Sequence, residues 1–303
     1  MQTQELVEKI NKLKKEKNAV ILAHSYQNVE IDLVADFVGD SLYLSRKAAE
    51  TDADIIVFAG VTFMAETAKI LSPDKKVLLP RKEAGCLMAD MIDLKQLREF
   101  KAQHLNIPVV CYVNSTAEVK SESDICCTSA NAINVIKSLK SDKVLFVPDT
   151  YLGTYAASQI EGVEVIPYPG FCPTHLRITK EDVAKMRENH PEALVLTHPE
   201  CHKEVVGVSD FVGSTTAIMK YAAESSNKEF IIVTEKGVVE RLERDYHDKK
   251  FYLISEKAIC PNMKWNELID IYNSLKYEQY EITVDEEIAK KALHTIEKMV
   301  AIS

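Results

Sequence analysis

The chain has 303 residues, of which 46% are hydrophobic and 27% are charged, and its formal net charge is −9. These values are typical of a globular protein with a large core. The acidic balance, without any dense block of Lys and Arg, argues against a nucleic-acid partner, and no apolar run approaches the ~20 residues that span a bilayer, so we expect no membrane partner either.

In chain order, a charged segment of helical period covers residues 1–18. It is unlike a signal peptide, and we therefore expect a cytoplasmic protein. Three apolar strands follow, at 19–26, 52–60 and 75–80, and the turn VGDS at 38–41 starts the helix after the first of them. This first unit ends at Cys86.

The same order of elements occurs twice more along the chain. Cys172 lies 86 residues after Cys86 and 88 residues before Cys260, and His24, Tyr112 and His198 are spaced by 88 and 86 residues. Two later helix starts carry the pattern of a capping box, Thr179 with Asp182 and Thr283 with Glu286. The second unit has strands 108–115, 142–149 and 163–169 with the turn CCTS at 126–129; the third has strands 193–200, 228–235 and 250–255 with the turn VGST at 212–215.

Helices that alternate with almost continuously apolar strands predict parallel sheets covered by helices. We expect an α/β fold of three similar Rossmann-like αβα units related by a pseudo-threefold axis. Ligands of parallel sheets bind beyond the carboxyl ends of the strands, so closure would bring the three sets of landmarks to one central site. An open solenoid is the alternative and would spread them along a row. The expected domains are residues 1–88, with C-terminal helices at 263–303 packed back on them, then 89–174 and 175–262.

Seven cysteines in a chain without a secretory signal argue against a disulfide framework. Cys86, Cys172 and Cys260 are equivalent in the repeat, and two of them precede proline, as some iron–sulfur ligands do. Three thiolates on one axis suit one face of a 4Fe–4S cluster. One iron would stay open to substrate as a Lewis acid, which predicts non-redox chemistry. The remaining cysteines are expected to be ordinary buried residues: Cys111, Cys126, Cys127 and Cys201.

Two other interpretations of the three cysteines stay open. Cys172 and His175 form a C-x-x-H pair, which fits a closed, structural zinc site with three Cys and one His. Alternatively, all three are small buried residues with no ligand. The repeat weakens this second interpretation, and a ring of polar side chains around the metal favours a catalytic centre over structural zinc.

Ser41, Ser129 and Thr215 each precede a helix in equivalent turns. Singly each is an ordinary N-cap, but three helix N-termini around one cavity would bind phosphate and carboxylate groups. Polar residues at the ends of the first strands would ring the same cavity, with His and Asn to hold carboxylates and Tyr and Glu to move protons. These are His24, Tyr26, Tyr112, Asn114, His198 and Glu200.

Nearly the whole chain resembles the quinolinate synthases, the A-type enzymes of NAD biosynthesis. The resemblance rests on long motifs in the same order: AHSYQ, DFVGDSLYLS, YVNSTAEVKSESDICCTSANA, VPDTYLG, PGFCPTH, HPECH, DFVGST, TEKG and CPNMK. It implies three α/β domains and one 4Fe–4S cluster per chain on Cys86, Cys172 and Cys260. It also implies that iminoaspartate (iminosuccinate) and dihydroxyacetone phosphate condense to quinolinate, phosphate and water. An L-aspartate oxidase or aspartate dehydrogenase would then supply the iminoaspartate.

The resemblance also implies roles for single residues. Tyr26 and Glu200 match the proposed acid/base residues, and His24 joins them as a catalytic residue. Longer members carry extra cysteines near the third ligand, whereas Cys260 stands alone, so no thiol–disulfide switch is expected there. The implied substrate-binding residues are His24, Ser41, Tyr112, Val113, Asn114, Ser129, His198, Pro199, Glu200 and Thr215.

Two other functions compete with this one. The first is another iron–sulfur hydro-lyase that acts on a small carboxylic acid and needs no phosphate site. The second, a non-catalytic iron or zinc sensor, leaves the ring of His, Tyr, Asn and Glu unexplained.

Overall fold

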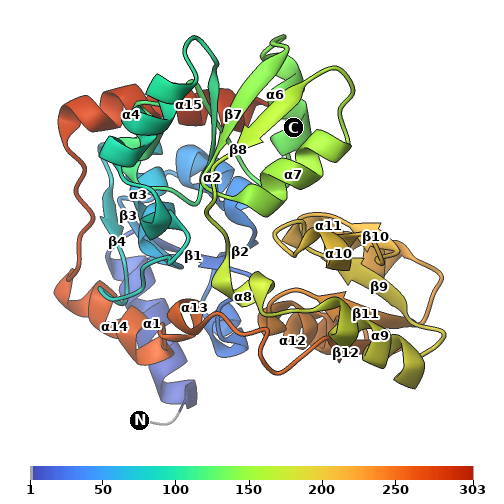
Figure 1. Ribbon diagram of the computed structural model, residues 1–303. Helices are drawn as coiled ribbons and strands as arrows, with labels where there is room; N and C mark the ends of the chain where they lie inside the picture. Colours follow the sequence, from blue (N-terminus) through green and yellow to red (C-terminus); the bar gives the residue numbers. More distant parts are fainter. Residues whose placement is uncertain (1–2, 303) are drawn as a thin grey trace.

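The computed structural model describes residues 3–302. Three parallel sheets, each of four strands and each flanked by helices, make up the molecule (Figure 1). The fold is therefore α/β with three similar Rossmann-like units, as the repeat predicted. None of the helices in the described residues is both long and apolar enough to cross a membrane.

The three sheets share one strand order. In each unit the first strand lies between the second and the third, and the fourth lies outside the third. The orders are β2-β1-β3-β4, β6-β5-β7-β8 and β10-β9-β11-β12. The bounds are β1 Ala19–His24, β2 Phe37–Gly39, β3 Ile55–Ala59, β4 Lys76–Leu78, β5 Val109–Tyr112, β6 Ile125–Cys127, β7 Lys143–Val147, β8 Glu164–Pro167, β9 Leu194–Thr197, β10 Phe211–Val212, β11 Glu229–Val233 and β12 Lys250–Leu253.

Each sheet has one strand more than the sequence analysis predicted. The additional strands, β2, β6 and β10, are only three, three and two residues long, too short to show an apolar period. They lead into the turns that were predicted to start helices. The central strands are apolar throughout because they are covered on both faces; all five residues of β3 are buried.

The helices complete the units in the same way. The first unit has α1 Thr3–Glu16, the 3-10 helix η1 Val29–Leu33, α2 Ser41–Glu50, α3 Thr62–Leu71 and the 3-10 helix η2 Ala89–Met91. The second has α4 Leu94–Gln103, α5 Ala117–Ser121, α6 Ala132–Ser138 and α7 Thr150–Ser158. The rest are α8 Pro173–Leu176, α9 Lys180–Asn189, α10 Lys203–Val206, α11 Thr215–Glu224, α12 Lys236–Asp245, α13 Pro261–Lys264, α14 Leu268–Tyr277 and α15 Glu286–Ala301.

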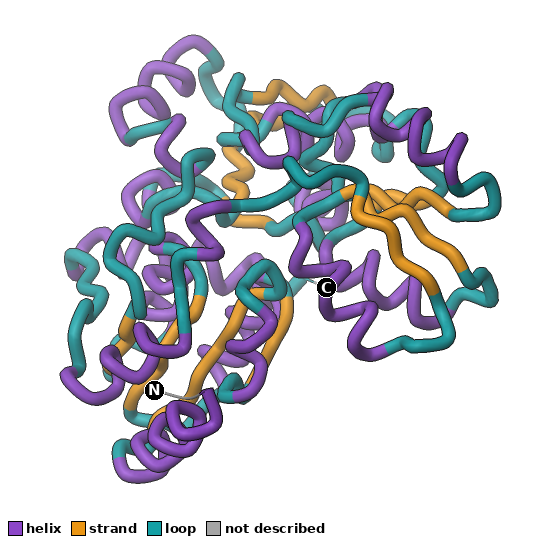
Figure 2. The backbone as a smooth tube through the Cα atoms, turned by 90° about the horizontal axis from the view of Figure 1, so that it is seen from below, coloured by secondary structure: helices purple, strands orange, loops and turns teal. Residues whose placement is uncertain are grey.

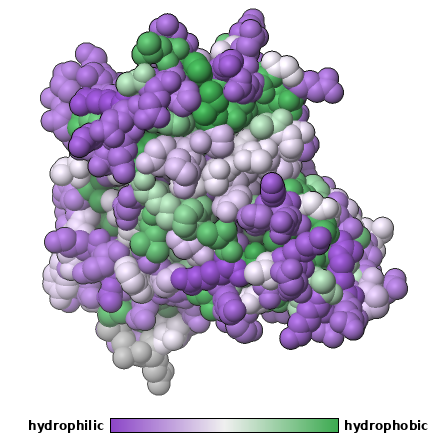
Figure 3. Space-filling view, in the orientation of Figure 1, coloured by the Kyte–Doolittle hydropathy of each residue, from purple (hydrophilic) through white to green (hydrophobic). Residues whose placement is uncertain are grey.

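The three units form a closed ring. The helix after each unit's central pair of strands contacts the segment after the first strand of the next unit: α3 contacts α5, α7 contacts α10, and α12 contacts η1. The last of these contacts returns from the third unit to the first, which an open solenoid would leave unmade. The tube view shows the three sheets around a common centre (Figure 2). On the face drawn in Figure 3, separate hydrophobic patches lie near the middle and near the top, among more hydrophilic residues.

The two C-terminal helices pack on the outside of this ring. Helix α14 packs on α1 and β3 of the first unit, whereas α15 packs on α5 and β6 of the second unit and on α3 and α2 of the first. One predicted capping box is confirmed, since Thr179 and Asp182 bond reciprocally at the start of α9. The other is wrong: the N-cap of α15 is Asp285, which accepts from the amides of Glu287 and Ile288.

Candidate active site

A cavity lies at the centre of the ring, beyond the carboxyl ends of the three sheets, and residues of all three units line it. Two of the predicted site residues, Val113 and Pro199, are not among the lining residues; the amide of Val113 instead bonds to the carbonyl of Cys127 at 2.8 Å. The predicted residues that do line the cavity are His24, Tyr26, Ser41, Cys86, Tyr112, Asn114, Ser129, Cys172, His198, Glu200, Thr215 and Cys260.

His24 and His198 have matching geometry. In each, Nδ1 accepts a hydrogen bond from the backbone amide two residues later, from Tyr26 at 3.1 Å and from Glu200 at 3.3 Å. Burial lowers the pKa of His24 to about 3, with the charge of Arg241 acting in the same direction. Burial likewise lowers the pKa of His198 to about 3. Both rings are therefore neutral at pH 7, with Nε2 left to donate.

The hydroxyl of Tyr26 sits between two threonines. It accepts from Thr215 Oγ1 at 3.1 Å and lies 2.8 Å from Thr234 Oγ1. Burial raises the pKa of Tyr26 well above its usual value, and the charge of Glu200 adds to that effect. Tyr26 is therefore a neutral hydroxyl in this site.

Glu200 is a buried carboxylate held on both oxygens. Oε1 accepts from the Tyr112 hydroxyl at 2.5 Å, and Oε2 lies 2.7 Å from His175 Nδ1. Burial raises the pKa of Glu200, but His198, His175 and the Tyr112 hydroxyl outweigh it and lower the pKa to about 2. Because His175 Nε2 is 2.9 Å from Thr234 Oγ1, one chain of polar contacts joins Glu200 to Tyr26.

The three turns differ in detail from the prediction. Ser41 and Thr215 are the first helical residues of α2 and α11, and the N-caps are one position earlier, at Asp40 and Ser214. Ser129 lies before the N-cap of α6 and its Oγ is 3.3 Å from His198 Nε2. These hydroxyls are therefore not caps; Thr215 Oγ1 instead donates to Tyr26 and Ser129 Oγ contacts His198.

The three cysteines converge on the cavity from equivalent positions. Burial raises the pKa of Cys86 to about 12, and the charge of Cys260 adds to it. Burial also raises the pKa of Cys172 and of Cys260, while backbone amides of the short helices that follow, His175 for Cys172 and Met263 for Cys260, act in the opposite direction. With their pKa values raised, these partly exposed thiols stay protonated at pH 7 unless a cation lies beside them, as it does beside the thiolate ligands of a metal centre.

The distances between the sulfur atoms of these thiols test whether one metal ion could bind all three. Two sulfur ligands of a single zinc lie within about 4.6 Å, because each Zn–S bond is about 2.3 Å. Within residues 3–302, the group whose ligand atoms lie within 4.8 Å of one another is Cys172, His175 and Glu200, and it includes neither Cys86 nor Cys260. The sulfur atoms of the three cysteines are therefore not all within 4.8 Å of one another, which argues against a single zinc bound by all three. A small metal site could use only Cys172 of the three.

Sequence analysis missed three residues that complete the site. It considered His175 only as a zinc ligand, although the ring lies between Cys172 Sγ, at 3.2 Å, and Glu200. It did not single out Thr234 or the cavity-lining Arg177. The signal for His175 is its place in the repeat, three residues after a candidate ligand, where the third unit has Met263.

Comparison with known proteins gives a consistent result. The family model described as quinolinate synthetase A protein matches residues 8–301. A protein of Alkaliphilus metalliredigens named quinolinate synthase is 58% identical over 297 residues, which cover 98% of each chain. A quinolinate synthase of Clostridium kluyveri is 54% identical over 297 residues, again 98% of each chain. One of Dehalococcoides mccartyi is 52% identical over 303 residues and the full length of both chains.

Proposed function

This chain belongs to the quinolinate synthetase A protein family, and we propose that it condenses iminoaspartate with dihydroxyacetone phosphate to quinolinate, phosphate and water in NAD biosynthesis. The observation that carries the proposal is the central cavity, where three equivalent thiols meet a ring of His, Tyr and Glu side chains. An L-aspartate oxidase or aspartate dehydrogenase would supply the iminoaspartate.

A 4Fe–4S cluster would be held by Cys86, Cys172 and Cys260. Their separation beyond the reach of a single zinc supports this assignment. When bound, the cluster would supply one iron without a thiolate ligand, a Lewis acid for substrate oxygen atoms. The three thiols are partly exposed and line a cavity between the three units.

Both substrates are anions, and the cavity offers donors for them. The amides at the start of α2 and α11 carry the positive ends of helix dipoles, beside the hydroxyls of Ser41 and Thr215. The neutral rings of His24 and His198 can donate through Nε2 without a buried positive charge. Arg177 is the guanidinium among the described lining residues and supplies the countercharge.

Proton transfer is assigned to Tyr26 and Glu200. Their polar contacts with Thr234 and His175 fix the two groups relative to each other across the first and third units. Ring closure needs protons moved between imine and enamine forms and onto a departing hydroxide. A neutral tyrosine and an ionised glutamate supply a donor and an acceptor for these steps.

The test combines metal analysis with product analysis on anaerobically purified protein. We expect about four iron and four acid-labile sulfide per chain with a brown charge-transfer band, and quinolinate only when both substrates are present. Turnover of a carboxylic acid without dihydroxyacetone phosphate would instead identify another hydro-lyase. One zinc without sulfide would overturn the proposal.

A further inference from the structure

Two buried carboxyl groups occupy equivalent helix N-caps in the second and third units. Asp149 and Glu235 are 86 residues apart, at equivalent positions of the second and third units, and both are fully buried. Each caps the next helix: Asp149 Oδ1 accepts from the Leu152 amide at 2.6 Å, and Glu235 Oε2 accepts from the Gly237 amide at 2.6 Å. Neither residue lines the cavity.

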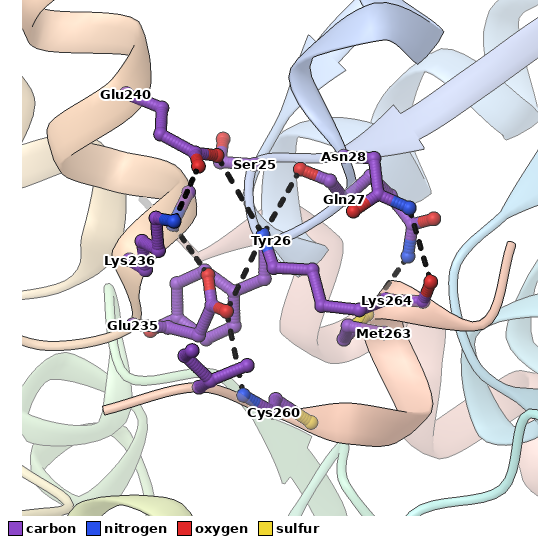
Figure 4. A network of polar contacts seen from close by, with 12 residues as sticks. Ser25, Tyr26, Gln27, Asn28, Glu235, Lys236, Glu240, Cys260, Met263 and Lys264 are labelled. Atoms are coloured by element: carbon purple, nitrogen blue, oxygen red, sulfur yellow. Dashed lines mark hydrogen bonds and ion pairs between the residues drawn. The ribbon is translucent and has the colours of Figure 1, made fainter. Parts of the chain in front are cut away.

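Glu235 also bonds directly to the backbone of a cysteine. Its Oε1 accepts from the Cys260 amide at 3.3 Å, and Figure 4 shows the carboxylate pointing at this amide from α12. The same oxygen lies 3.4 Å from Lys264 Nζ, which also contacts Gln27 O and Glu240. With Gly237 on Oε2, the carboxylate uses both oxygens on backbone amides.

Asp149 takes a similar place in the second unit. Burial raises the pKa of Asp149 well above its usual range, and the amides of Leu152, Tyr151 and Cys172 act in the opposite direction. Within residues 3–302, the hydrogen bond between a carboxylate and a cavity-cysteine amide is that of Glu235 with Cys260. Asp149 Oδ2 is buried without a hydrogen-bond partner among residues 3–302, an unfavourable arrangement that capping alone does not require.

The backbone around all three cysteines follows one plan. The first amide of the helix bonds to the carbonyl two residues before the cysteine, at 2.8 Å for Thr62 and Ala84, 2.8 Å for Thr150 and Gly170, and 2.9 Å for Lys236 and Ala258. The first unit has Val61 where the others have a carboxyl group, with no side-chain cap. The carboxyl groups are thus an addition to the shared plan, present where the cysteine is followed by proline.

We propose that Glu235 is a positioning residue for the cluster, which occupies the backbone amide of Cys260 and lowers the reduction potential of the cluster. An amide that bonds to a carboxylate is withheld from the sulfur atoms, and the residue after Cys260, Pro261, has no amide hydrogen to offer. Hydrogen bonds to sulfur and net charge both set the potential of such clusters. A lower potential keeps the cluster oxidised, as non-redox chemistry needs. This inference rests on the proposed cluster.

The experiment compares Glu235→Gln and Glu235→Ala with wild type, in anaerobic protein carrying its cluster. Gln keeps the size of the side chain but has one acceptor oxygen for two amides; Ala removes both acceptors. We expect the midpoint potential, followed by electron paramagnetic resonance during reductive titration, to rise in both variants and more in Ala. Iron release to a chelator should also become faster.

Two controls separate positioning from general damage. Glu240→Gln removes another carboxylate beside Lys264 without touching Cys260, and Asp285→Ala removes a helix cap on α15. Both should keep the wild-type potential and rate of iron release. Equal potentials in wild type and the Glu235 variants, or equal shifts in the controls, would overturn the inference. Wild-type protein without iron and sulfide would instead overturn the proposed function.

Discussion

At the scale of single residues, the repeat preserves backbone geometry more closely than side-chain chemistry. His24 and His198 use the same bond from the amide two residues later, while the second unit has Tyr112 at this position. The sequence predicted that these residues share a place, because strand ends are equivalent in each unit. It could not predict that Tyr112 would bond to Glu200 of another unit, because that contact depends on how the units close.

The hydroxyl of Tyr26 is expected to be required for turnover. Tyr26→Phe should lower kcat by about 10²–10⁴-fold, the usual contribution of one proton-transfer group, with iron content unchanged. The matched control is Tyr155→Phe, which removes a hydroxyl that bonds to Val212 O outside the cavity and should keep activity. Wild-type turnover in Tyr26→Phe would exclude Tyr26 from proton transfer.

The three cavity cysteines should differ from the other cysteines in one measurement, the iron content. Serine at Cys86, Cys172 or Cys260 should lose most of the iron, because a hydroxyl is a poor replacement for a thiolate ligand. The same change at Cys201, a buried neighbour of Glu200, should keep it. Full iron after one of the first three changes would remove that cysteine from the ligand set.

At the scale of elements, the sequence predicted the longer strands of each unit and the order in which they follow one another along the chain. Strand β3 is apolar over all five residues and β11 over four of its five, and turns flank both, so the apolar pattern is enough to predict them. The short strands β2, β6 and β10 escaped because sheet pairing, rather than local pattern, makes two or three residues a strand. The cap of α15 was misplaced because both Thr283 and Asp285 have capping side chains.

One element contact that the sequence does not reveal is the buried pair between α12 and η1. Arg241 is 1% exposed, pairs with Asp32, and donates to Ser25 O at 2.7 Å and Gln27 O at 3.0 Å, thereby holding the segment that carries Tyr26. Arg241→Gln should lower the free energy of unfolding by about 3–5 kcal/mol, because it removes the buried partner of the Asp32 carboxylate. Urea unfolding measures this.

Arg244 supplies the control, because it pairs with the same Asp32 but is largely exposed. Arg244→Gln should change the unfolding free energy by less than about 1 kcal/mol. Equal effects of the two substitutions would show that burial of the Arg241 pair does not stabilise the contact between the third and first units.

At the scale of the whole molecule, the closure of the three units into a ring could be predicted, but the packing of the C-terminal helices across it could not. Equal units with functional residues at equivalent strand ends favoured a ring, and the contact of α12 with η1 completes it. The sequence placed the C-terminal helices on the first unit, and α14 does pack there, whereas α15 extends across to the second unit. An amphipathic helix shows in its sequence that it packs, but not on which neighbour. The domain boundaries themselves stay a prediction.

One carboxylate joins segments that lie far apart in the sequence, and its pKa leads to a prediction about stability at acid pH. Glu278, which follows α14, pairs with Lys17 after α1 and with Lys76 of β4. Hydrogen bonds from Lys17 and Lys76 lower the pKa of Glu278 to about 2, below its ordinary value of 4.5. A folded-state pKa below the unfolded one means that the stabilisation is complete above pH 4.5 and is lost as pH falls towards 2.

Glu278→Gln should therefore lower the unfolding free energy at pH 7 by at most about 1 kcal/mol, because the pair is partly exposed and screened. The difference from wild type should shrink between pH 4.5 and 2, and 1 M salt should reduce it at pH 7. Glu5→Gln breaks a pair with Lys9 inside α1, joins no separate segments, and should have a smaller effect. An ionised Glu278 loses its contribution to the unfolding free energy when it is protonated. If the difference between wild type and Glu278→Gln instead grew as the pH fell, Glu278 would not be held as a carboxylate by Lys17 and Lys76 in the folded protein.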